Sequence, residues 1–404
     1  MNNKTIIYMG NFQMFPLNAA GKRVLNNSKL LKSIGYNVII ISCEKVSEQT
    51  IKEIDGIKVY SVSYPLSTKE WLEYEKVYKN IITIFNEIEL KNEVCAIINY
   101  GAPRISFFMK KILNFCKKKN IICISDCVDW LHTPRNGNVV FRLAKWADTT
   151  YQKRYINKKM DGMIVISEFL KKYYEQTIKH IIILPPLSEK CFNSLKPINI
   201  DENAVNILYA GIPFNTKKII KDPIDMKDRL DLIIKCFEKM TDINYNLHIY
   251  GLEKKEVIFS MPSLENTIKK IGEKIHFYGL KDNDFILNEI SKCDYTILFR
   301  DKKRDTTAGF PTKVAESITQ GTPVITNDTS DIRNYLEKQG LAFFVNDIND
   351  ATNEVKKIIE NNKSQINDLK NKCKSSGIFE YSSYQLEMKT FMSELKKEGS
   401  KILL

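Results

Sequence analysis

A stretch near the C-terminal end of the chain, residues 309–328, joins a helix start to groups that bind phosphate. Pro311 suits the first position of a helix, where its missing N–H is no loss. The free backbone N–H groups of that helix start, with Thr312 and Lys313 in its first turn, favour a phosphate. Glu316 lies one turn further on the same face, where it is either a ligand for sugar hydroxyls or a solvated helix residue.

The same stretch continues into a strand, and other strands of the second half end at a glycine. Gly321 suits the left-handed residue just past a helix end, and Pro323–Thr326 is a β-branched run typical of a buried parallel strand. Gly211, Gly251 and Gly279 each end a predicted strand. Because ligands of open α/β sheets bind beyond the carboxyl ends of strands, these glycines favour a binding site there.

Strand and helix patterns alternate along the whole chain, which predicts an α/β fold with open parallel sheets. The rhythm breaks at Pro185-Pro186 and the polar stretch that follows, and it restarts with a strand at Asn206. We therefore predict a Rossmann-like domain over residues 1–187, a second one over 188–378, and a C-terminal helical segment over 379–404 that is long enough to cross the domain boundary.

Composition limits the class of protein. A chain of 404 residues with 43% hydrophobic content is long enough for two domains with real cores. The 61 Lys and Arg against 48 Asp and Glu give a net charge of +13, which either favours acidic partners or is a general solubility charge. The lysines are spread along the chain rather than gathered in one run, which argues against a nucleic-acid binder.

Cysteine use and hydropathy predict a cytoplasmic protein. The nine cysteines are odd in number and lack paired spacing, as expected of free thiols in a reducing compartment. Lys4–Gly10 reads as a first strand rather than a signal peptide, and no stretch approaches the roughly 18 apolar residues of a membrane span. Two basic segments with interleaved aromatics, Phe107–Lys119 and Arg142–Lys158, predict binding to the anionic inner membrane face, although aromatics at helical spacing also suit a core.

In order and spacing, these stretches resemble the GT-B glycosyltransferases of family 4, especially the bacterial group that builds capsules and other surface polysaccharides. The resemblance covers almost the whole chain and is strongest in the second half. It is carried by Tyr209-Ala210-Gly211, Lys227-Asp228 with residues 230–234, Arg300 with residues 308–313 and Glu316, residues 321–326, residues 126–130, and residues 164–170.

The resemblance implies two Rossmann-like domains that face a cleft, and a C-terminal helix that crosses back to the first. It also implies metal-independent, retaining hexosyl transfer, without a further cofactor, from a nucleoside-diphosphate sugar, with a UDP-sugar expected. The acceptor is a glycan or a polyprenyl-diphosphate-linked glycan. A carboxylate pair that would suit a metal, Asp282 and Asp284, sits at a helix start and reads better as a cap.

The residues implied for donor binding are Gly21, Gly211, Lys227, Arg300, Gly309, Phe310, Thr312, Lys313 and Glu316. Those implied for catalysis are Asp126, Asp129, Lys227 and Arg300, and those for the acceptor are Asp129 and His132. Breaking the sugar–phosphate bond builds negative charge on the diphosphate, and preorganised cations stabilise that charge. Several of these residues also have an alternative, purely structural role. Asp126 and Asp129 are alternatively caps, Lys227 an ordinary helix-start lysine, Arg300 a partner of Asp301 or Asp305, Gly21 part of a helix start, and His132 a loop residue.

Two departures from the family pattern leave other functions open. Ala308 stands where many members carry the first glutamate of Glu-x7-Glu, and Asp126 or Asp129 stands in the region of their usual histidine. The chain is therefore alternatively a non-catalytic GT-B subunit that binds nucleotide or glycan and supports a partner enzyme. A sugar-nucleotide epimerase is disfavoured because only 4 histidines are present.

Overall fold

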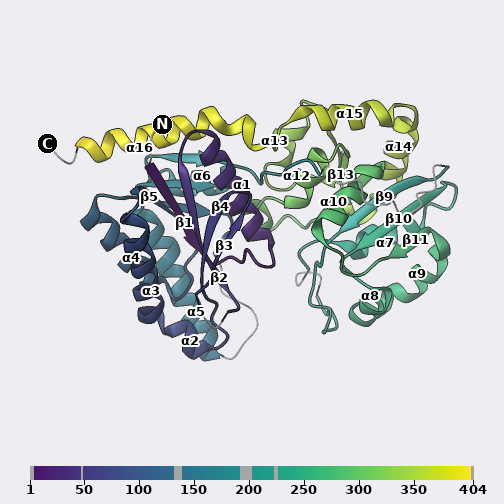
Figure 1. Cartoon of the computed structure of the whole chain (residues 1–404). Helices are drawn as coiled ribbons and strands as arrows, with labels where there is room; N and C mark the ends of the chain where they lie inside the picture. The colour runs from purple at the N-terminus through teal and green to yellow at the C-terminus, as the bar shows by residue number, and fades with distance from the viewer. Residues whose placement is uncertain (1–3, 47–48, 132–138, 192–202, 223–225, 402–404) are drawn as a thin grey trace. The chain divides into compact units, whose positions relative to one another are not determined.

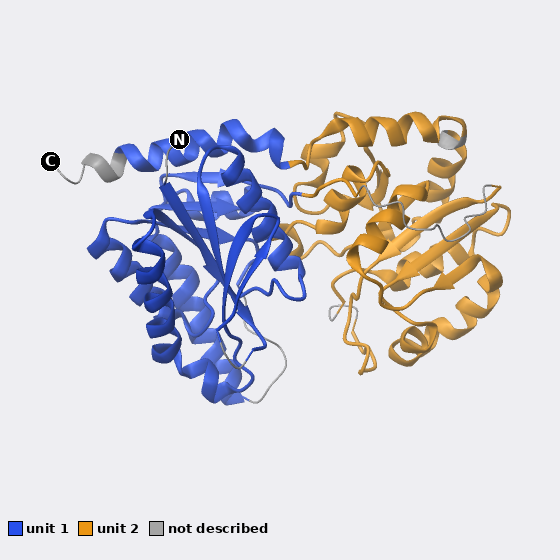
Figure 2. Cartoon of the chain, in the orientation of Figure 1, with its two compact units in different colours: residues 1–187, 381–404 blue, residues 188–380 orange. Residues whose placement is uncertain are grey.

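The computed structural model describes residues 4–46, 49–131, 139–191, 203–222 and 226–401. They form two compact units, each built on one mainly parallel sheet (Figure 2). Unit 1 comprises residues 1–187 and 381–404, and unit 2 comprises residues 188–380. The predicted α/β fold with two parallel sheets is confirmed, as is the return of the C-terminal helix to the N-terminal part of the chain.

Unit 1 holds an eight-stranded sheet in the order β3-β4-β2-β1-β5-β6-β7-β8, in which only β3 runs antiparallel to its neighbour. Its strands are β1 (Lys4–Gly10), β2 (Asn37–Glu44), β3 (Ile51–Ile54), β4 (Ile57–Ser63), β5 (Glu93–Tyr100), β6 (Ile122–Cys127), β7 (Gly162–Val165) and β8 (Ile181–Ile183). Its helices are α1 (Ala19–Ser33), α2 (Thr68–Leu72), α3 (Tyr74–Glu89), α4 (Ser106–Lys119), α5 (Val139–Tyr151), α6 (Glu168–Tyr174) and α16 (Gln385–Lys401).

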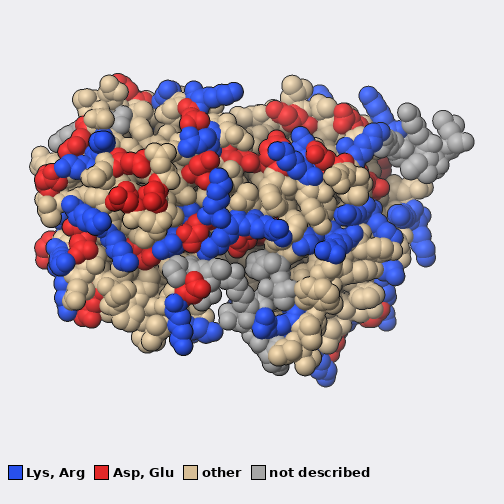
Figure 3. Space-filling view, turned by 180° about the vertical axis from the view of Figure 1, so that it is seen from behind, with Lys and Arg blue, Asp and Glu red and all other residues tan. Residues whose placement is uncertain are grey.

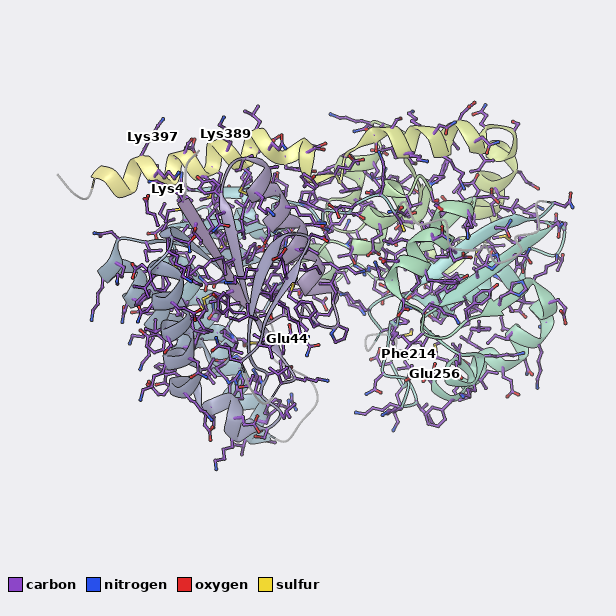
Figure 4. All side chains as sticks on the ribbon, viewed as in Figure 1. Lys4, Glu44, Phe214, Glu256, Lys389 and Lys397 are labelled. Atoms are coloured by element: carbon purple, nitrogen blue, oxygen red, sulfur yellow. The ribbon has the colours of Figure 1, made fainter. Side chains whose placement is uncertain are left out.

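Helices cover both faces of this sheet (Figure 1). For that reason its central strands are apolar throughout rather than alternating, as β1 shows by burying Ile6 and Ile7 on opposite faces. One core cluster joins α1 and the strands to α16, which contributes Met388 and Phe391. The opposite side of α16 is polar, and Figure 4 shows Lys389 and Lys397 pointing away from the sheet.

Unit 2 holds a six-stranded, wholly parallel sheet in the order β11-β10-β9-β12-β13-β14. Its strands are β9 (Val205–Ala210), β10 (Tyr245–Tyr250), β11 (Ile275–Phe277), β12 (Tyr295–Leu298), β13 (Val324–Asn327) and β14 (Ala342–Val345). Its helices are α7 (Leu230–Glu238), α8 (Lys254–Ser260), α9 (Glu265–Ile271), α10 (Asn283–Lys292), α11 (Arg304–Ala308), α12 (Thr312–Thr319), α13 (Ile332–Leu336), α14 (Thr352–Asn362) and α15 (Ile366–Ser376).

Some element boundaries differ from the sequence prediction. The apolar pattern predicts a strand over Ile121–Ser125, but β6 runs on to Cys127 and so includes Asp126. The predicted helix over Val139–Lys158 is α-helical only to Tyr151, and it continues as a π-helical turn over Gln152–Ile156. Sequence periodicity also missed β3 and α8, because each is too short to show a full pattern.

The surface carries the charge in a dispersed form. Figure 3 shows Lys and Arg over the face turned to the viewer, with Asp and Glu among them. All nine cysteines are free thiols. Among the helices that the structure describes, none is both long and apolar enough to cross a membrane.

Candidate active site

Four side chains of unit 2 meet where strands end, and we call them the unit 2 cluster: Tyr209, Asp228, Arg300 and Lys313. They come from β9, the segment before α7, the residues just after β12 and the first turn of α12. One oxygen of the Asp228 carboxylate, Oδ1, accepts a hydrogen bond from Arg300 Nε at 2.7 Å. The other, Oδ2, accepts one from the Tyr209 hydroxyl at 2.9 Å and pairs with Lys313 Nζ. Both carboxylate oxygens are therefore held by a cation.

The electrostatics of the unit 2 cluster leave it positive. Burial alone would raise the pKa of Asp228, but the nearby Lys313 and Arg300 outweigh it and hold that pKa well below its usual range. Burial lowers the pKa of Lys313, and the charge of Asp228 opposes this effect. Two cations and one carboxylate leave one net positive charge at the carboxyl ends of the strands. Such a site favours an anion.

Main-chain hydrogen bonds hold Arg300 in place, and a glycine leaves room for Lys313. The Arg300 N–H donates to Asn327 Oδ1 at 3.0 Å, and Asn327 Nδ2 donates back to the Arg300 carbonyl at 2.8 Å. Gly211, with a φ of +147°, leaves room for Lys313, since a Cβ atom there would lie 2.2 Å from Lys313 Nζ. The strand-end glycine predicted from the sequence thus has a specific packing partner.

A second ion network lies beside the unit 2 cluster and excludes Asp301 as the partner of Arg300. Asp301 pairs with Arg229 at 2.9 Å and with Lys303 at 3.1 Å, not with Arg300. Arg229 also grips both oxygens of Asp231 at 2.9 Å. Arg300 therefore has Asp228 as its carboxylate partner.

The remaining predicted donor residues of unit 2 lie around this cluster. Helix α12 begins at Thr312, one residue later than predicted, with Pro311 at its N-cap. Lys227 is exposed, and its charge lowers the pKa of Lys313. Glu316 is partly buried and lines, with Lys313, a cavity of about 20 Å³.

Two further residues predicted to bind the donor, Gly309 and Phe310, have side chains that are unsuited to contact it. Gly309 is buried just after α11 and has an extended backbone, with no positive φ. The Phe310 ring is packed edge-on against Tyr335 and Phe379, so that side chain belongs to the core. Any donor contact by these two residues would have to come from the main chain.

The carboxylate pair Asp282 and Asp284, predicted as a helix cap rather than a metal site, lies at the start of α10. Asp282 occupies the N-cap position of α10, but its side chain makes no capping hydrogen bond. Within the described residues, no group of three or more His, Cys, Asp or Glu is placed to hold a metal ion.

In unit 1, Asp126 lies in a buried polar cluster. Arg23 Nε donates to Oδ1 and Oδ2 of Asp126 at 3.1 and 3.0 Å, and Arg23 Nη2 donates to Oδ1 at 2.8 Å. The Tyr8 hydroxyl and Asn27 Nδ2 donate to Oδ2 at 2.5 and 3.3 Å. Asp126 is 3% exposed and Arg23 is 5% exposed. These are the contacts of a structural ion pair, and the predicted catalytic role of Asp126 stays a prediction.

Asp126 and Asp129 also line a cavity of about 500 Å³ within unit 1. Asp129 is exposed, whereas Asp126 is buried among the polar side chains described above. Trp71 and Lys145 lie on the same cavity, with Lys145 Nζ 3.9 Å from the centre of the Trp71 ring. An aromatic face and charged groups suit a sugar-containing ligand. The predicted acceptor residue His132 lies outside the described residues.

The N-terminal loop of unit 1 packs closely on Gly21. A Cβ atom at Gly21 would lie 2.1 Å from the Gln13 carbonyl oxygen, so only glycine allows this approach. Glu44, labelled in Figure 4, holds the loop by accepting hydrogen bonds from the Met14 N–H at 2.7 Å and the Phe15 N–H at 3.4 Å. The donor-binding role of Gly21 stays a prediction.

Sequence reasoning assigned no role to Asp228, Tyr209, Asn327 or Arg23. A charged residue within an apolar neighbourhood signals that a buried partner must exist, but it does not identify that partner. Asp228 and Lys313, for example, are separated by 85 residues.

Comparisons with known proteins define the class of fold. Residues 224–377, which lie within unit 2, match the model of the family described as "Glycosyl transferases group 1". No curated protein sequence matches the chain.

Solved structures match over almost the full length. Sucrose-phosphate synthase from Thermosynechococcus elongatus has a TM-score of 0.67 at 12% identity, over 98% of this chain and 100% of its own. The structure described as "Trehalose-6-phosphate from E. coli bound with UDP-2-fluoro glucose" has a TM-score of 0.64 at 11% identity, over 97% and 99%. Anabaena HepE in complex with UDP has a TM-score of 0.57 at 11% identity, over 98% and 100%. At these identities the matches establish the fold, which is the GT-B fold predicted from the sequence.

Proposed function

We propose that this protein is a retaining glycosyltransferase of the family 4 type, which moves a sugar from a nucleoside-diphosphate sugar to a glycan acceptor. The observation that carries the proposal is the convergence of Arg300 and Lys313 on one carboxylate at the strand ends of unit 2, with net positive charge remaining. The group 1 match over residues 224–377 supports it. Structural relatives described with UDP and UDP-2-fluoro glucose support a UDP-sugar as the donor.

In this proposal, the unit 2 cluster receives the diphosphate leaving group. Negative charge grows on that group as the sugar–phosphate bond breaks, so the fixed charges of Arg300 and Lys313 stabilise the transition state more than the ground state. Glu316, on the same helix as Lys313, accepts hydrogen bonds from the ribose. The departing phosphate helps to deprotonate the acceptor. Because Arg300 and Lys313 neutralise the leaving group, no metal is required. The cavity of unit 1 takes the acceptor, with Asp129 at its exposed side.

Calorimetry with the purified chain tests the donor site. Lys313→Ala and Arg300→Ala should each weaken UDP binding by about 1.5–3 kcal/mol, the range for a hydrogen bond to a charged group. Lys235→Ala, which removes an exposed lysine from α7, is the matched control and should leave the affinity unchanged. Unchanged affinity in both site variants would exclude the assignment.

The stereochemistry of the reaction needs a separate test. NMR measures the anomeric configuration of the product formed from each of a panel of UDP-sugars, and retention predicts the same configuration as in the donor.

We further propose that the protein works on the cytoplasmic membrane face and extends a lipid-linked glycan in surface polysaccharide synthesis. Helix α5 buries none of its side chains, and Val140, Leu143 and Trp146 are 76%, 60% and 57% exposed. Phe107 of α4 is 50% exposed and stacks on Tyr151 at 5.2 Å. Exposed apolar groups with basic neighbours suit insertion into an anionic interface, because lipid attracts each nearby cation by roughly 1 kcal/mol.

Vesicle flotation tests this location. The protein should float with vesicles that contain anionic lipid at low salt, and rising salt should release it. The double variant Leu143→Glu, Trp146→Glu should lose most of this binding. Phe259→Glu, which places the same charge at an exposed apolar site of α8, is the control and should still float. A protein that stays in solution at low salt points to a soluble acceptor instead.

One observation favours a second candidate, a non-catalytic GT-B subunit. Ala308 stands at the position of the family's first glutamate and is fully buried, so it offers the donor sugar no carboxylate. Such a subunit would bind UDP with the affinity pattern described above but would neither hydrolyse nor transfer a sugar. Slow hydrolysis of a UDP-sugar by the purified chain would favour the enzyme.

A further inference from the structure

We infer that Asp228 is a positioning residue for the donor diphosphate, which holds Arg300 and Lys313 by their inner donors and leaves their outer donors for the ligand. The inference rests on the proposed function, because it takes a diphosphate as the anion that the two cations receive. Asp228 is not itself a ligand for that anion, since both are negatively charged.

The donor geometry supports this division. Arg300 binds Asp228 through Nε alone. As far as the chain is described, its two terminal nitrogens have no hydrogen-bond partner, although the Arg300 side chain is only 5% exposed. Lys313 Nζ has three protons, and Asp228 and the Tyr209 hydroxyl, at 3.2 Å, account for two of them. The Lys313 side chain remains 26% exposed, so its third proton is available to a ligand.

The carboxylate is also fixed. The Asp228 side chain is 1% exposed, and Tyr209 binds it from β9. The next residue, Arg229, donates its N–H to the Phe299 carbonyl at 2.7 Å, which ties this segment to the end of β12. Asp228 therefore cannot turn out to solvent without breaking several contacts, and the two cations it holds are preorganised rather than free to move.

Without Asp228 the cations would interfere with each other. Burial, Arg300 and Lys227 all lower the pKa of Lys313, and Asp228 is the neighbour that raises it. Tyr209 stays neutral because burial, and then Asp228, raise its pKa well above the ordinary value. Removing the Asp228 charge would therefore release the proton of Lys313 at lower pH, and a neutral lysine binds phosphate poorly.

A positioning role for Asp228 and a purely electrostatic role predict changes of opposite sign in the affinity for an anion. If Asp228 acted only as a nearby negative charge, its neutralisation would tighten binding of any anion. If Asp228 positions the two cations, Asp228→Asn weakens binding even though it removes a negative charge. The effect grows as pH rises, because the variant loses the Lys313 proton earlier than the wild-type protein does.

The experiment is calorimetry of the full chain with inorganic pyrophosphate and with UDP, repeated across a pH series. We expect Asp228→Asn to bind both probes about tenfold more weakly at neutral pH, with a deficit that increases toward alkaline pH. Asp231→Asn is the matched control, because this carboxylate lies on the adjacent turn, pairs with Arg229 and has a side chain that is 12% exposed. It should leave both affinities and their pH dependence unchanged.

A second variant keeps the inference testable if Asp228→Asn does not fold. Tyr209→Phe keeps every charge and removes one hydrogen bond to Asp228, so we expect about threefold weaker pyrophosphate binding. Equal or tighter binding in Asp228→Asn, with no added pH dependence, overturns the inference, as does unchanged binding in Tyr209→Phe. Lys313→Ala separates the two levels: if it does not weaken pyrophosphate binding, the proposed donor site itself is wrong.

Discussion

Arg23 of α1 holds both carboxylate oxygens of Asp126 of β6, and both side chains are almost fully buried in unit 1. Arg23 Nη1 also donates to the Leu184 carbonyl at 3.1 Å, so the pair joins the first helix to the residues after β8. A buried, fully hydrogen-bonded pair costs much to break, because the partner that remains is a buried charge. The structure thus gives Asp126 a task in stability that the sequence pattern did not indicate.

We expect Asp126→Asn and Arg23→Met each to lower the free energy of unfolding of unit 1 by about 3–5 kcal/mol. Urea unfolding followed by circular dichroism measures this loss. Lys111→Ala, which breaks an exposed pair with Glu75, is the control and should change stability little. A catalytic Asp126 gives the reverse pattern, in which Asp126→Asn abolishes sugar transfer and leaves the unfolding curve in place.

Gly211 and Lys313 offer a test that leaves every charge of the site intact. In Gly211→Ala, the new methyl group would lie 2.5 Å from Lys313 Cε and closer still to Nζ, so the lysine must leave its place beside Asp228. We expect about tenfold weaker UDP binding in calorimetry. Gly272→Ala is the control, because Gly272 also has a positive φ, of +65°, but an added Cβ meets nothing within 4 Å. Equal losses in both variants would assign the effect to backbone strain alone.

The order of elements was largely predictable from the sequence, because it depends on local patterns. Apolar β-branched runs mark the buried parallel strands, and Gly321 ends α12 with a φ of +86°, as the pattern predicted. The strand β13 also falls within one residue of its predicted start.

The partners inside the sites were not predictable, because they depend on which strand ends become neighbours. Arg300 follows β12 and Asp228 precedes α7, and only the pairing of β12 with β9 brings them together. Lys313 reaches the same carboxylate because Gly211 leaves space for it. The partners of Asp126 were unpredictable for a related reason, because β6 continues two residues beyond its predicted end and Arg23 reaches it from α1.

Buried histidine makes the stability of unit 2 depend on pH. His248 of β10 is 5% exposed, and burial, followed by the neighbouring His276, lowers its pKa to about 4. Its ring contacts Asn206 Oδ1 at 3.1 Å and the Tyr278 hydroxyl at 3.0 Å. The unfolded chain binds a proton near pH 6.5, whereas the folded chain does so only near pH 4. Stability is therefore lost as pH falls through this interval, by up to about 3 kcal/mol.

Thermal unfolding between these two pH values measures the effect. The transition assigned to unit 2 should move to lower temperature as the solution becomes acidic. His248→Gln retains hydrogen-bonding capacity but cannot gain a proton, so its unfolding should depend less on pH than that of the wild-type protein. A pH dependence that is identical in the two proteins would show that other groups cause it.

Glu316 is expected to bind the ribose and not to act as a general base. It lies on α12 with Lys313, one turn from the helix start, and the two residues line the same small cavity. We expect Glu316→Gln to raise the KM for the UDP-sugar about tenfold and to leave kcat nearly unchanged, because a ribose contact is made equally in ground and transition states. Glu265→Gln, the same change on α9, should alter neither constant.

A double-mutant cycle with UDP and 2′,3′-dideoxy-UDP isolates the contact between Glu316 and the ribose. The dideoxy nucleotide should bind wild-type protein more weakly than UDP does, and Glu316→Gln should remove most of that difference. A fall in kcat with unchanged UDP affinity would instead assign Glu316 to the reacting sugar.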